Sequence, residues 1–141
     1  MVDIRPYLVF NGTCEAAFLF YSSVFQIEIP YMGRFKDMNK EGGPEMSASD
    51  GEKVMHVTLP IAENFDLMGS DTNSQSGDVI MGSNVSLSIN TKSKDEADKL
   101  FNGLSAGGII KMPMQDTFWN AYFGMFTDKF GIYWMVNFDK I

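Results

Sequence analysis

Residues 13–24, TCEAAFLFYSSV, and residues 93–104, SKDEADKLFNGL, decide the fold of this 141-residue chain. In each segment a hydroxyl side chain is followed by apolar residues at three- and four-residue intervals, which is the spacing of an amphipathic helix that begins at its cap. The second segment also opens with a capping box, Ser93-Lys94-Asp95-Glu96. The two apolar stripes match at a constant offset of 80 residues, which pairs Thr13, Ala17, Tyr21 and Val24 with Ser93, Ala97, Phe101 and Leu104. We therefore predict a duplicated chain with one such helix in each half.

Short apolar runs surround each predicted helix and have the composition of β-strands. The expected strands are residues 4–10, 27–35, 53–60 and 65–70 in the first half, and residues 85–89, 109–114, 118–127 and 132–138 in the second. Each half then has the order βαβββ, with module 1 at about residues 1–78 and module 2 at about residues 79–141. An amphipathic helix buries its stripe on one sheet face, which leaves the opposite face to curve around a cavity. We predict an α+β fold, a single domain over residues 1–141 with curved mixed sheets around that cavity.

Two segments of the first half carry more specific expectations. Residues 53–60 alternate between two faces of their strand, with Met55, Val57 and Leu59 on one face and Val54, His56 and Thr58 on the other. The segment from Asp37 to Gly51 is rich in small and charged residues, and we predict a long mobile loop or lid there.

The composition is that of an ordinary soluble globular protein, with 45% hydrophobic and 21% charged residues. A net charge of −7 repels phosphate backbones, so we expect no nucleic-acid partner. Cys14 is the single cysteine, which permits no internal disulfide, and its place on an apolar stripe argues against a nucleophile. The chain has no apolar run of about 18 residues and no signal-peptide pattern at its start, so we expect a cytoplasmic protein with no membrane partner.

Several motifs resemble those of a known family. Residues 6–17, PYLVFNGTCEAA, residues 115–119, QDTFW, residues 127–131, TDKFG, and the pair Trp134-Met135 are similar to PhnB-like proteins of the vicinal oxygen chelate superfamily. That superfamily includes glyoxalases, bleomycin-resistance proteins and extradiol dioxygenases, and the resemblance implies a glyoxalase-like fold of paired βαβββ units. Some PhnB-like proteins carry the label demethylubiquinone methyltransferase. No Gly-rich turn here follows a strand and opens a helix, however, as a doubly wound cofactor-binding sheet requires.

The resemblance also implies where a metal site would lie. The metal enzymes of the superfamily take His, Gln or Glu ligands from the first and last strands of each half, at positions that match Pro6, Leu67 or Met68, Asn84 and Met135. Proline and leucine have no ligating side-chain atom, methionine suits soft ions, and asparagine is a weak neutral oxygen donor. We therefore expect that the inherited metal site is missing and that the protein uses no cofactor.

His56 is the single histidine, so no site with several histidine ligands can be built from one chain. Imidazole exchanges protons near neutral pH, and the resemblance implies a histidine in this strand, so His56 is the candidate catalytic base. Asp71 follows a strand end and is the second catalytic candidate, since it could pair with His56 and raise its basicity. The plainer interpretations are a structural histidine bonded to a polar neighbour and an aspartate in a simple turn.

Five further residues are candidate ligand contacts: Asn84, Gln115, Trp119, Tyr122 and Met135. The amide, indole and phenol groups near the penultimate strand combine apolar surface with hydrogen-bonding atoms, as in pockets for flat molecules. The asparagine begins a polar row with Ser86 and Ser88 that either enters the cavity or faces solvent. The eleven methionines either fill the core or adapt to variable ligands, and the tryptophan either lines the pocket or packs in the core or a dimer contact.

Two functions remain open at this point. In the first, the protein is a metal-independent small-molecule binding protein that holds an apolar or aromatic ligand, as bleomycin-resistance relatives sequester a drug. In the second, it is an isomerase or lyase that acts beside a carbonyl, with His56 as base and Gln115 or Asn84 stabilising an oxyanion. A weakly bound divalent metal near His56 and Asp71 is a variant of the second. The missing ligands favour the first, and the resemblance implies a homodimer that completes its cavities across a two-fold axis.

Overall fold

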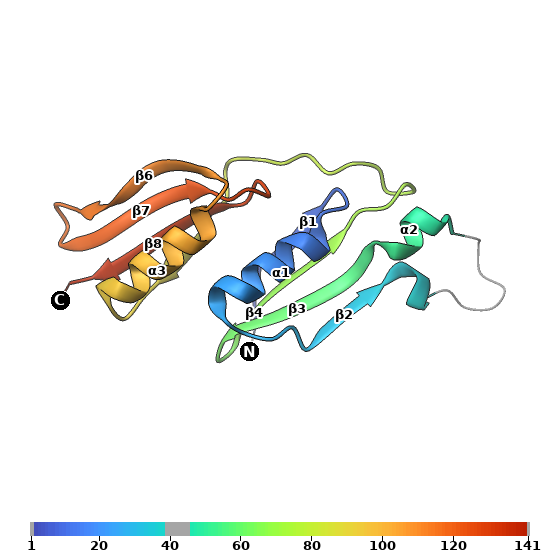
Figure 1. The fold of residues 1–141 in the computed structure, drawn as a ribbon, viewed down its shortest axis with the longest axis horizontal. Coiled ribbons are helices and arrows are strands. Elements are labelled where there is room, and N and C mark those ends of the chain that lie inside the picture. The colour runs from blue at the N-terminus through green and yellow to red at the C-terminus, as the bar shows by residue number, and fades with distance from the viewer. Residues whose placement is uncertain (1, 39–45, 141) are drawn as a thin grey trace. The chain divides into compact units, whose positions relative to one another are not determined.

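The computed structural model describes residues 2–38 and 46–140. Its contacts divide the chain into two units, Met1–Ile80 and Met81–Ile141. Each unit is a four-stranded mixed sheet with one 12-residue helix packed on one face (Figure 1). The predicted α+β class with two βαβββ modules is therefore confirmed.

The N-terminal unit consists of β1 (Tyr7–Phe10), α1 (Cys14–Phe25), β2 (Tyr31–Arg34), the 3-10 helix η1 (Phe35–Met38), α2 (Ala48–Glu52), β3 (Val54–Ala62) and β4 (Phe65–Asp71). Its sheet has the order β1-β4-β3-β2, in which β1 and β4 are parallel and the other neighbours are antiparallel. The loop predicted over residues 37–51 is partly wrong, because α2 begins at Ala48. Residues 39–45 of that prediction lie outside the described residues.

Helix α1 packs on the sheet face that carries Leu59 of β3 and its partner Leu67 of β4, both fully buried. Val57 pairs with Gly69 on the same face. The glycine makes room for the ring of Phe18, because a Cβ at this position would lie 2.6 Å from the Phe18 Cε1. The apolar stripe predicted from the sequence is thus the surface by which α1 packs on the sheet.

A β-bulge near the start of β3 changes the predicted alternation of its side chains. The register of β2 against β3 leaves Met55 as an extra residue. Val54 is consequently fully buried together with Val57, whereas strict alternation predicted Val54 on the face of His56. His56 and Thr58 share one face, as predicted.

The C-terminal unit consists of β5 (Leu87–Asn90), α3 (Lys94–Ser105), β6 (Ile109–Asp116), β7 (Ala121–Thr127) and β8 (Tyr133–Asp139). Its sheet has the order β5-β8-β7-β6, again with the first and last strands of the unit parallel. Helix α3 packs the edge of the Phe101 ring against the Phe126 ring of β7, with ring centroids 5.1 Å apart. Gly124 gives this helix close access to β7, because a Cβ there would lie 2.7 Å from the Phe101 Cε2.

The two long helices begin differently, although their sequences predict similar caps. The Ser93 hydroxyl accepts the Glu96 N–H at 3.0 Å, and the Glu96 carboxylate accepts the backbone N–H just before the cap at 3.1 Å. Thr13 makes no such bond to α1 within the described chain, and Asp71 of β4 accepts the Cys14 N–H at 2.9 Å instead. Over residues 2–38 and 46–140, no helix has the length and apolar character needed to cross a membrane.

Candidate functional site

The face of the N-terminal sheet opposite α1, here the N-terminal open face, carries one row of side chains across all four strands. The row runs through four cross-strand partners: Tyr7, Met68, Thr58 and Tyr31. His56 lies on the same face, two residues along β3 from Thr58. Tyr7 and Tyr31 are 44% and 51% exposed, so solvent reaches both ends of the row.

His56 lies between these side chains and uses both of its ring nitrogens. Its Nδ1 is 3.1 Å from the Tyr7 Oη, and its Nε2 is 3.0 Å from the Thr58 Oγ1. Both partners are neutral hydroxyls that can donate or accept a hydrogen bond, so the arrangement accommodates either imidazole tautomer. In each tautomer one ring N–H donates to a hydroxyl oxygen while the other nitrogen accepts a hydroxyl proton.

Two tyrosine rings flank the imidazole. The ring centroid of His56 is 5.6 Å from that of Tyr7 and 6.3 Å from that of Tyr31, at tilts of 32° and 37°. Gly33, the β2 partner of His56, permits the second contact, since a Cβ there would lie 2.9 Å from the Tyr31 Cζ. The result is a half-exposed aromatic surface with hydrogen-bonding atoms at its centre, a surface that suits a flat ligand.

Asp71, the predicted partner of His56, does not reach it. Along β4 it alternates onto the face covered by α1, where it is 4% exposed. Its Oδ1 accepts the N–H groups of Gly12 and Cys14 at 3.0 and 2.9 Å, and its Oδ2 accepts the Val54 N–H at 3.0 Å. Asp71 thus ties the starts of α1 and β3 to the end of β4. The prediction that Asp71 pairs with His56 is therefore wrong. The two side chains lie on opposite faces of the sheet and do not form a shared site for a divalent metal.

The thiol of Cys14 is buried, which disfavours a role as nucleophile. Burial, with the nearby carboxylates of Asp71 and Glu15, raises the pKa of the Cys14 thiol well above its usual range. The thiolate is therefore disfavoured, which agrees with the interpretation from the sequence.

The donor set does not fit a divalent metal ion. Of the inherited positions, Met68 lies on the N-terminal open face, Leu67 is buried on the α1 face, and Pro6 uses its carbonyl to accept the Met68 N–H at 3.4 Å. In the part of the chain that the structure describes, no three His, Cys, Asp or Glu side chains come together to hold a metal. Thioethers suit soft ions only.

The face of the C-terminal sheet opposite α3, the C-terminal open face, carries a row of methionines. Met112, Met125 and Met135 are cross-strand partners on β6, β7 and β8, and Ser88 of β5 completes the row. The next row places amides around one aromatic ring, in the order Gln115, Phe123, Asn137 and Asn90. Two predicted ligand contacts, Met135 and Gln115, therefore share one face with an adaptable apolar floor and hydrogen-bonding edges.

Trp119 and Tyr122 lie on different sides of this sheet. Trp119 is 52% exposed in the turn between β6 and β7, and its ring is 5.9 Å from that of Phe123 on the C-terminal open face. Tyr122 lies on the α3 side, where its hydroxyl donates to Asp98 at 2.6 Å. This hydrogen bond, with desolvation and the Asp98 and Asp116 charges, raises the pKa of Tyr122 to about 12. Tyr122 is therefore not a contact on the open face, contrary to the prediction.

Asn84 also lies elsewhere than predicted. The expected strand over residues 85–89 begins instead at Leu87, so Asn84 precedes β5 and is exposed. The β5 residue beside Met135 is Ser88. Of the predicted polar row, Asn84 and Ser86 precede β5, and Ser88 is the member that lies on this strand.

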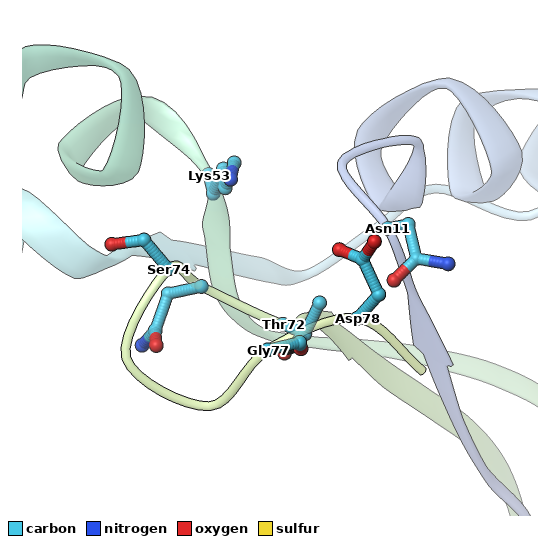
Figure 2. A pocket seen from close by; sticks show the side chains of 7 residues that line it. Asn11, Lys53, Thr72, Ser74, Gly77 and Asp78 are labelled. Carbon is cyan, nitrogen blue, oxygen red and sulfur yellow. Dashed lines mark hydrogen bonds between the residues drawn. The ribbon is translucent and has the colours of Figure 1, made fainter. Parts of the chain in front are cut away.

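A polar hollow of about 380 Å³ lies beside the end of β4 (Figure 2). The Asn11 side chain in its wall makes two bonds to Val79, accepting its N–H at 2.8 Å and donating to its carbonyl at 3.0 Å. Ser74 and Lys53 both donate to Asp50, and these bonds lower the pKa of the Asp50 carboxyl. The hollow is bounded by contacts that hold the segment after β4 against β1 and α2.

The sequence patterns predict strands over Tyr7 and Tyr31 but do not mark either tyrosine as a site residue. Their contacts with His56 depend on the parallel pairing of β1 with β4 and on the space above Gly33. Thr58 had a usable signal, since simple alternation places it on the face of His56.

Two helix-covered sheets of this topology form a glyoxalase-like fold. The structure of a glyoxalase/bleomycin resistance protein/dioxygenase family enzyme from Burkholderia phytofirmans PsJN superposes with a TM-score of 0.64. That match is 14% identical and covers 97% of this chain and 98% of the other, so it shows the fold alone.

The family follows from closer matches. The family described as 3-demethylubiquinone-9 3-methyltransferase matches residues 2–137. Protein YjdN of Escherichia coli K12 is 34% identical, over 99% of this chain and 97% of its own. Protein PA1353 of Pseudomonas aeruginosa is 41% identical with a TM-score of 0.84, covering 99% and 98% of the two chains. A PhnB protein of Bacillus cereus is 27% identical with a TM-score of 0.72, covering 97% and 99%. The chain belongs to this PhnB-like family, as its motifs predicted.

Proposed function

We propose that this protein binds a small apolar or aromatic molecule on its N-terminal open face without a metal ion. The observation that carries the proposal is the position of His56 between the rings of Tyr7 and Tyr31, with hydroxyls on both of its nitrogens. Aromatic rings bury large areas of a flat ligand, and the central polar atoms fix its orientation. The positions of the inherited metal ligands, which hold proline, leucine, methionine and asparagine, support binding without a divalent ion.

The C-terminal open face supports the same kind of ligand. Its row of three methionines offers a polarizable surface that adapts to ligands of different shape. Gln115 and Trp119 supply hydrogen-bonding groups beside it. We propose that Met135, Gln115 and Trp119 contribute to binding on this face.

A second function, an isomerase or lyase that acts beside a carbonyl, is favoured by one observation. The imidazole of His56 is held by two groups that can each pass a proton, as general acid–base catalysis requires. Asn84, which that hypothesis also used, is exposed before β5 and offers no fixed donor to an oxyanion.

Ligand-observed NMR with a panel of aromatic fragments tests the binding function, together with metal analysis of protein purified without chelator. We expect binding to metal-free protein, with affinity reduced about tenfold or more in His56→Ala, because the loss of the imidazole removes the hydrogen bonds that hold the Tyr7 and Thr58 hydroxyls. Tyr122→Phe, a tyrosine on the helix-covered face of the other sheet, is the control and should bind as the wild type does. Stoichiometric metal that disappears in His56→Ala would instead support a metal-assisted enzyme.

We also propose that the protein is a cytoplasmic homodimer. Phe118 and Trp119, 97% and 52% exposed in one turn, leave aromatic surface that a second copy would cover. Light scattering after gel filtration measures the mass directly, and 15.8 kDa at all concentrations would contradict the dimer.

A further inference from the structure

The hydrogen bonds of His56 leave it poorly placed to meet a ligand directly. Both ring nitrogens are engaged within the protein, Nδ1 with Tyr7 and Nε2 with Thr58, and the residue is half-buried. The Tyr7 side chain is 44% exposed on the same face, and its hydroxyl is the outer end of the chain of bonds Tyr7–His56–Thr58. Of the three residues in this chain of bonds, Tyr7 alone is exposed, so a ligand on this surface reaches it more readily than it reaches His56.

We propose that Tyr7 is the residue that exchanges a hydrogen bond or a proton with the ligand, that His56 is a positioning residue behind it, and that the ligand carries a weakly acidic hydroxyl, as a phenol or an enol does. This inference rests on the proposed binding function and names the ligand class of the same site. A hydroxyl compound extends the existing chain of hydroxyls and imidazole without leaving any of its members unpaired.

The tautomer of His56 sets what Tyr7 offers to the ligand. When Nε2 carries the proton and donates to Thr58, Nδ1 accepts the Tyr7 proton, and the Tyr7 oxygen is free to accept the ligand's O–H. When Nδ1 carries the proton and donates to Tyr7, the Tyr7 O–H points outward and donates to the ligand. A hydroxyl ligand can therefore pair with Tyr7 in both tautomers, whereas an ether, which can only accept, can pair in only one of them.

In a proton transfer, the same chain moves one proton in two coupled steps. The ligand O–H proton passes to the Tyr7 oxygen while the Tyr7 proton passes to the His56 Nδ1. The ligand is left as a phenolate or enolate anion, and the imidazole becomes a cation whose Nε2–H still donates to Thr58. No electron changes hands, and reversal of both transfers restores every group.

The charged groups on this face do not replace the tyrosine in this role. Arg5, two residues before Tyr7, donates to Asp66 of β4 and to Asp3, the latter at 2.9 Å. Its guanidinium is thus already held by two carboxylates, so the hydroxyl of Tyr7 is the available partner for a neutral ligand.

The first test needs no ligand. We expect Thr58→Val to shift the 13Cζ resonance of Tyr7, although the two residues are joined only through His56, and Thr58→Ser to restore it. Tyr7→Phe should change the 15N resonance of the His56 Nδ1, whereas Tyr31→Phe, which keeps its ring against His56, should not. A Tyr7 resonance unchanged in Thr58→Val would overturn the relay.

The second test compares 4-nitrophenol with 4-nitroanisole, which has the same ring and no hydroxyl. We expect 4-nitrophenol to bind the wild type about tenfold more tightly than it binds Tyr7→Phe, the effect of one hydrogen bond, and 4-nitroanisole, which can only accept a hydrogen bond, to lose clearly less affinity in Tyr7→Phe. Equal binding of the two compounds to the wild type would refute the ligand class while the binding function stood. If neither compound bound, the binding function itself would fail. A 4-nitrophenol that moved the His56 resonances equally in both proteins would assign the contact to His56 instead.

Discussion

Replacement of Asp71 by asparagine should destabilise the N-terminal unit strongly. The carboxylate accepts three backbone donors, of which those of Cys14 and Val54 are buried, and asparagine keeps one acceptor oxygen and no charge. With the amide oxygen on Gly12 and Cys14, the new NH₂ group faces the Val54 N–H. A hydrogen bond to a charged group contributes about 1.5–3 kcal/mol, and a buried donor without an acceptor costs about 1–3 kcal/mol. We expect the free energy of unfolding to fall by about 3 kcal/mol in Asp71→Asn and by about 4 kcal/mol in Asp71→Ala.

Urea unfolding followed by far-UV circular dichroism measures this loss. Both tryptophans, Trp119 and Trp134, lie in the C-terminal unit, so tryptophan fluorescence would not report on the unit that the substitution affects. Amide hydrogen exchange at Cys14 and Val54 should be faster in Asp71→Asn than in the wild type, by the factor that corresponds to the same loss of free energy. Asp78→Asn is the control, because Asp78 is exposed and should change stability by less than about 0.5 kcal/mol.

The opposite pattern would refute this reasoning about Asp71. If Asp71→Asn unfolded at the urea concentration of the wild type and yet lost the affinity for aromatic fragments, the carboxylate would act at the ligand site, as the sequence suggested. A lower urea midpoint with unchanged affinity in the folded protein is the result that the three backbone bonds predict.

Two further predictions concern the sheets. Tyr122 should ionise near pH 12 in a spectrophotometric titration, and Asp98→Asn should move this pKa down toward the ordinary value of 10. Because the pKa of Tyr122 is higher in the folded state, the stability that the protonated phenol contributes is complete below about pH 10 and is lost as the pH rises to about 12. Melting curves of the wild type and of Tyr122→Phe, recorded at pH 9 and pH 12, measure this loss. Gly69→Ala should lower the free energy of unfolding by about 1–3 kcal/mol through overpacking against Phe18, as measured by urea unfolding. Gly82→Ala is the control and should be nearly neutral, because the nearest atom to its new Cβ is 3.5 Å away. Equal effects of the two substitutions would contradict the packing argument.

Short sequence patterns predicted the repeated architecture because the apolar spacing that defines each helix lies within the helix itself. Each helix of the duplication shows its core face within one dozen residues, and α1 and α3 have the predicted extents to within about two residues. The capping hydroxyl of Ser93 is likewise settled by residues three apart. The cap of α1 could not be predicted from neighbouring residues, because its acceptor, Asp71, lies in a strand and is 57 residues further along the chain than Cys14.

The candidate site was only partly predictable because pairing between distant strands decides it. Alternation placed His56 and Thr58 together, but the bond to Tyr7 requires the parallel register of β1 against β4, which no short pattern contains. The alternation of side chains along β4 also places Asp71 on the face of the sheet opposite His56. Leu67 and Gly69 precede Asp71 at steps of two on the buried face, so extending the predicted strand by one residue would have assigned the carboxylate correctly.

The duplicated plan gives each unit a similar buried carboxylate and a different open face. Asp71 accepts backbone donors on one face of its sheet, and Asp128 in the second unit accepts the N–H groups of Phe130 and Ile132 and the indole N–H of Trp134. Both carboxylates hold turns and strand ends, so their charges belong to the framework. The group that differs between the repeats is therefore the better guide to function, and in the first repeat it is an imidazole held between two hydroxyls. Because only hydroxyl groups contact this imidazole, the arrangement supports the proposal that the site binds weak acids or moves one proton between neighbouring atoms.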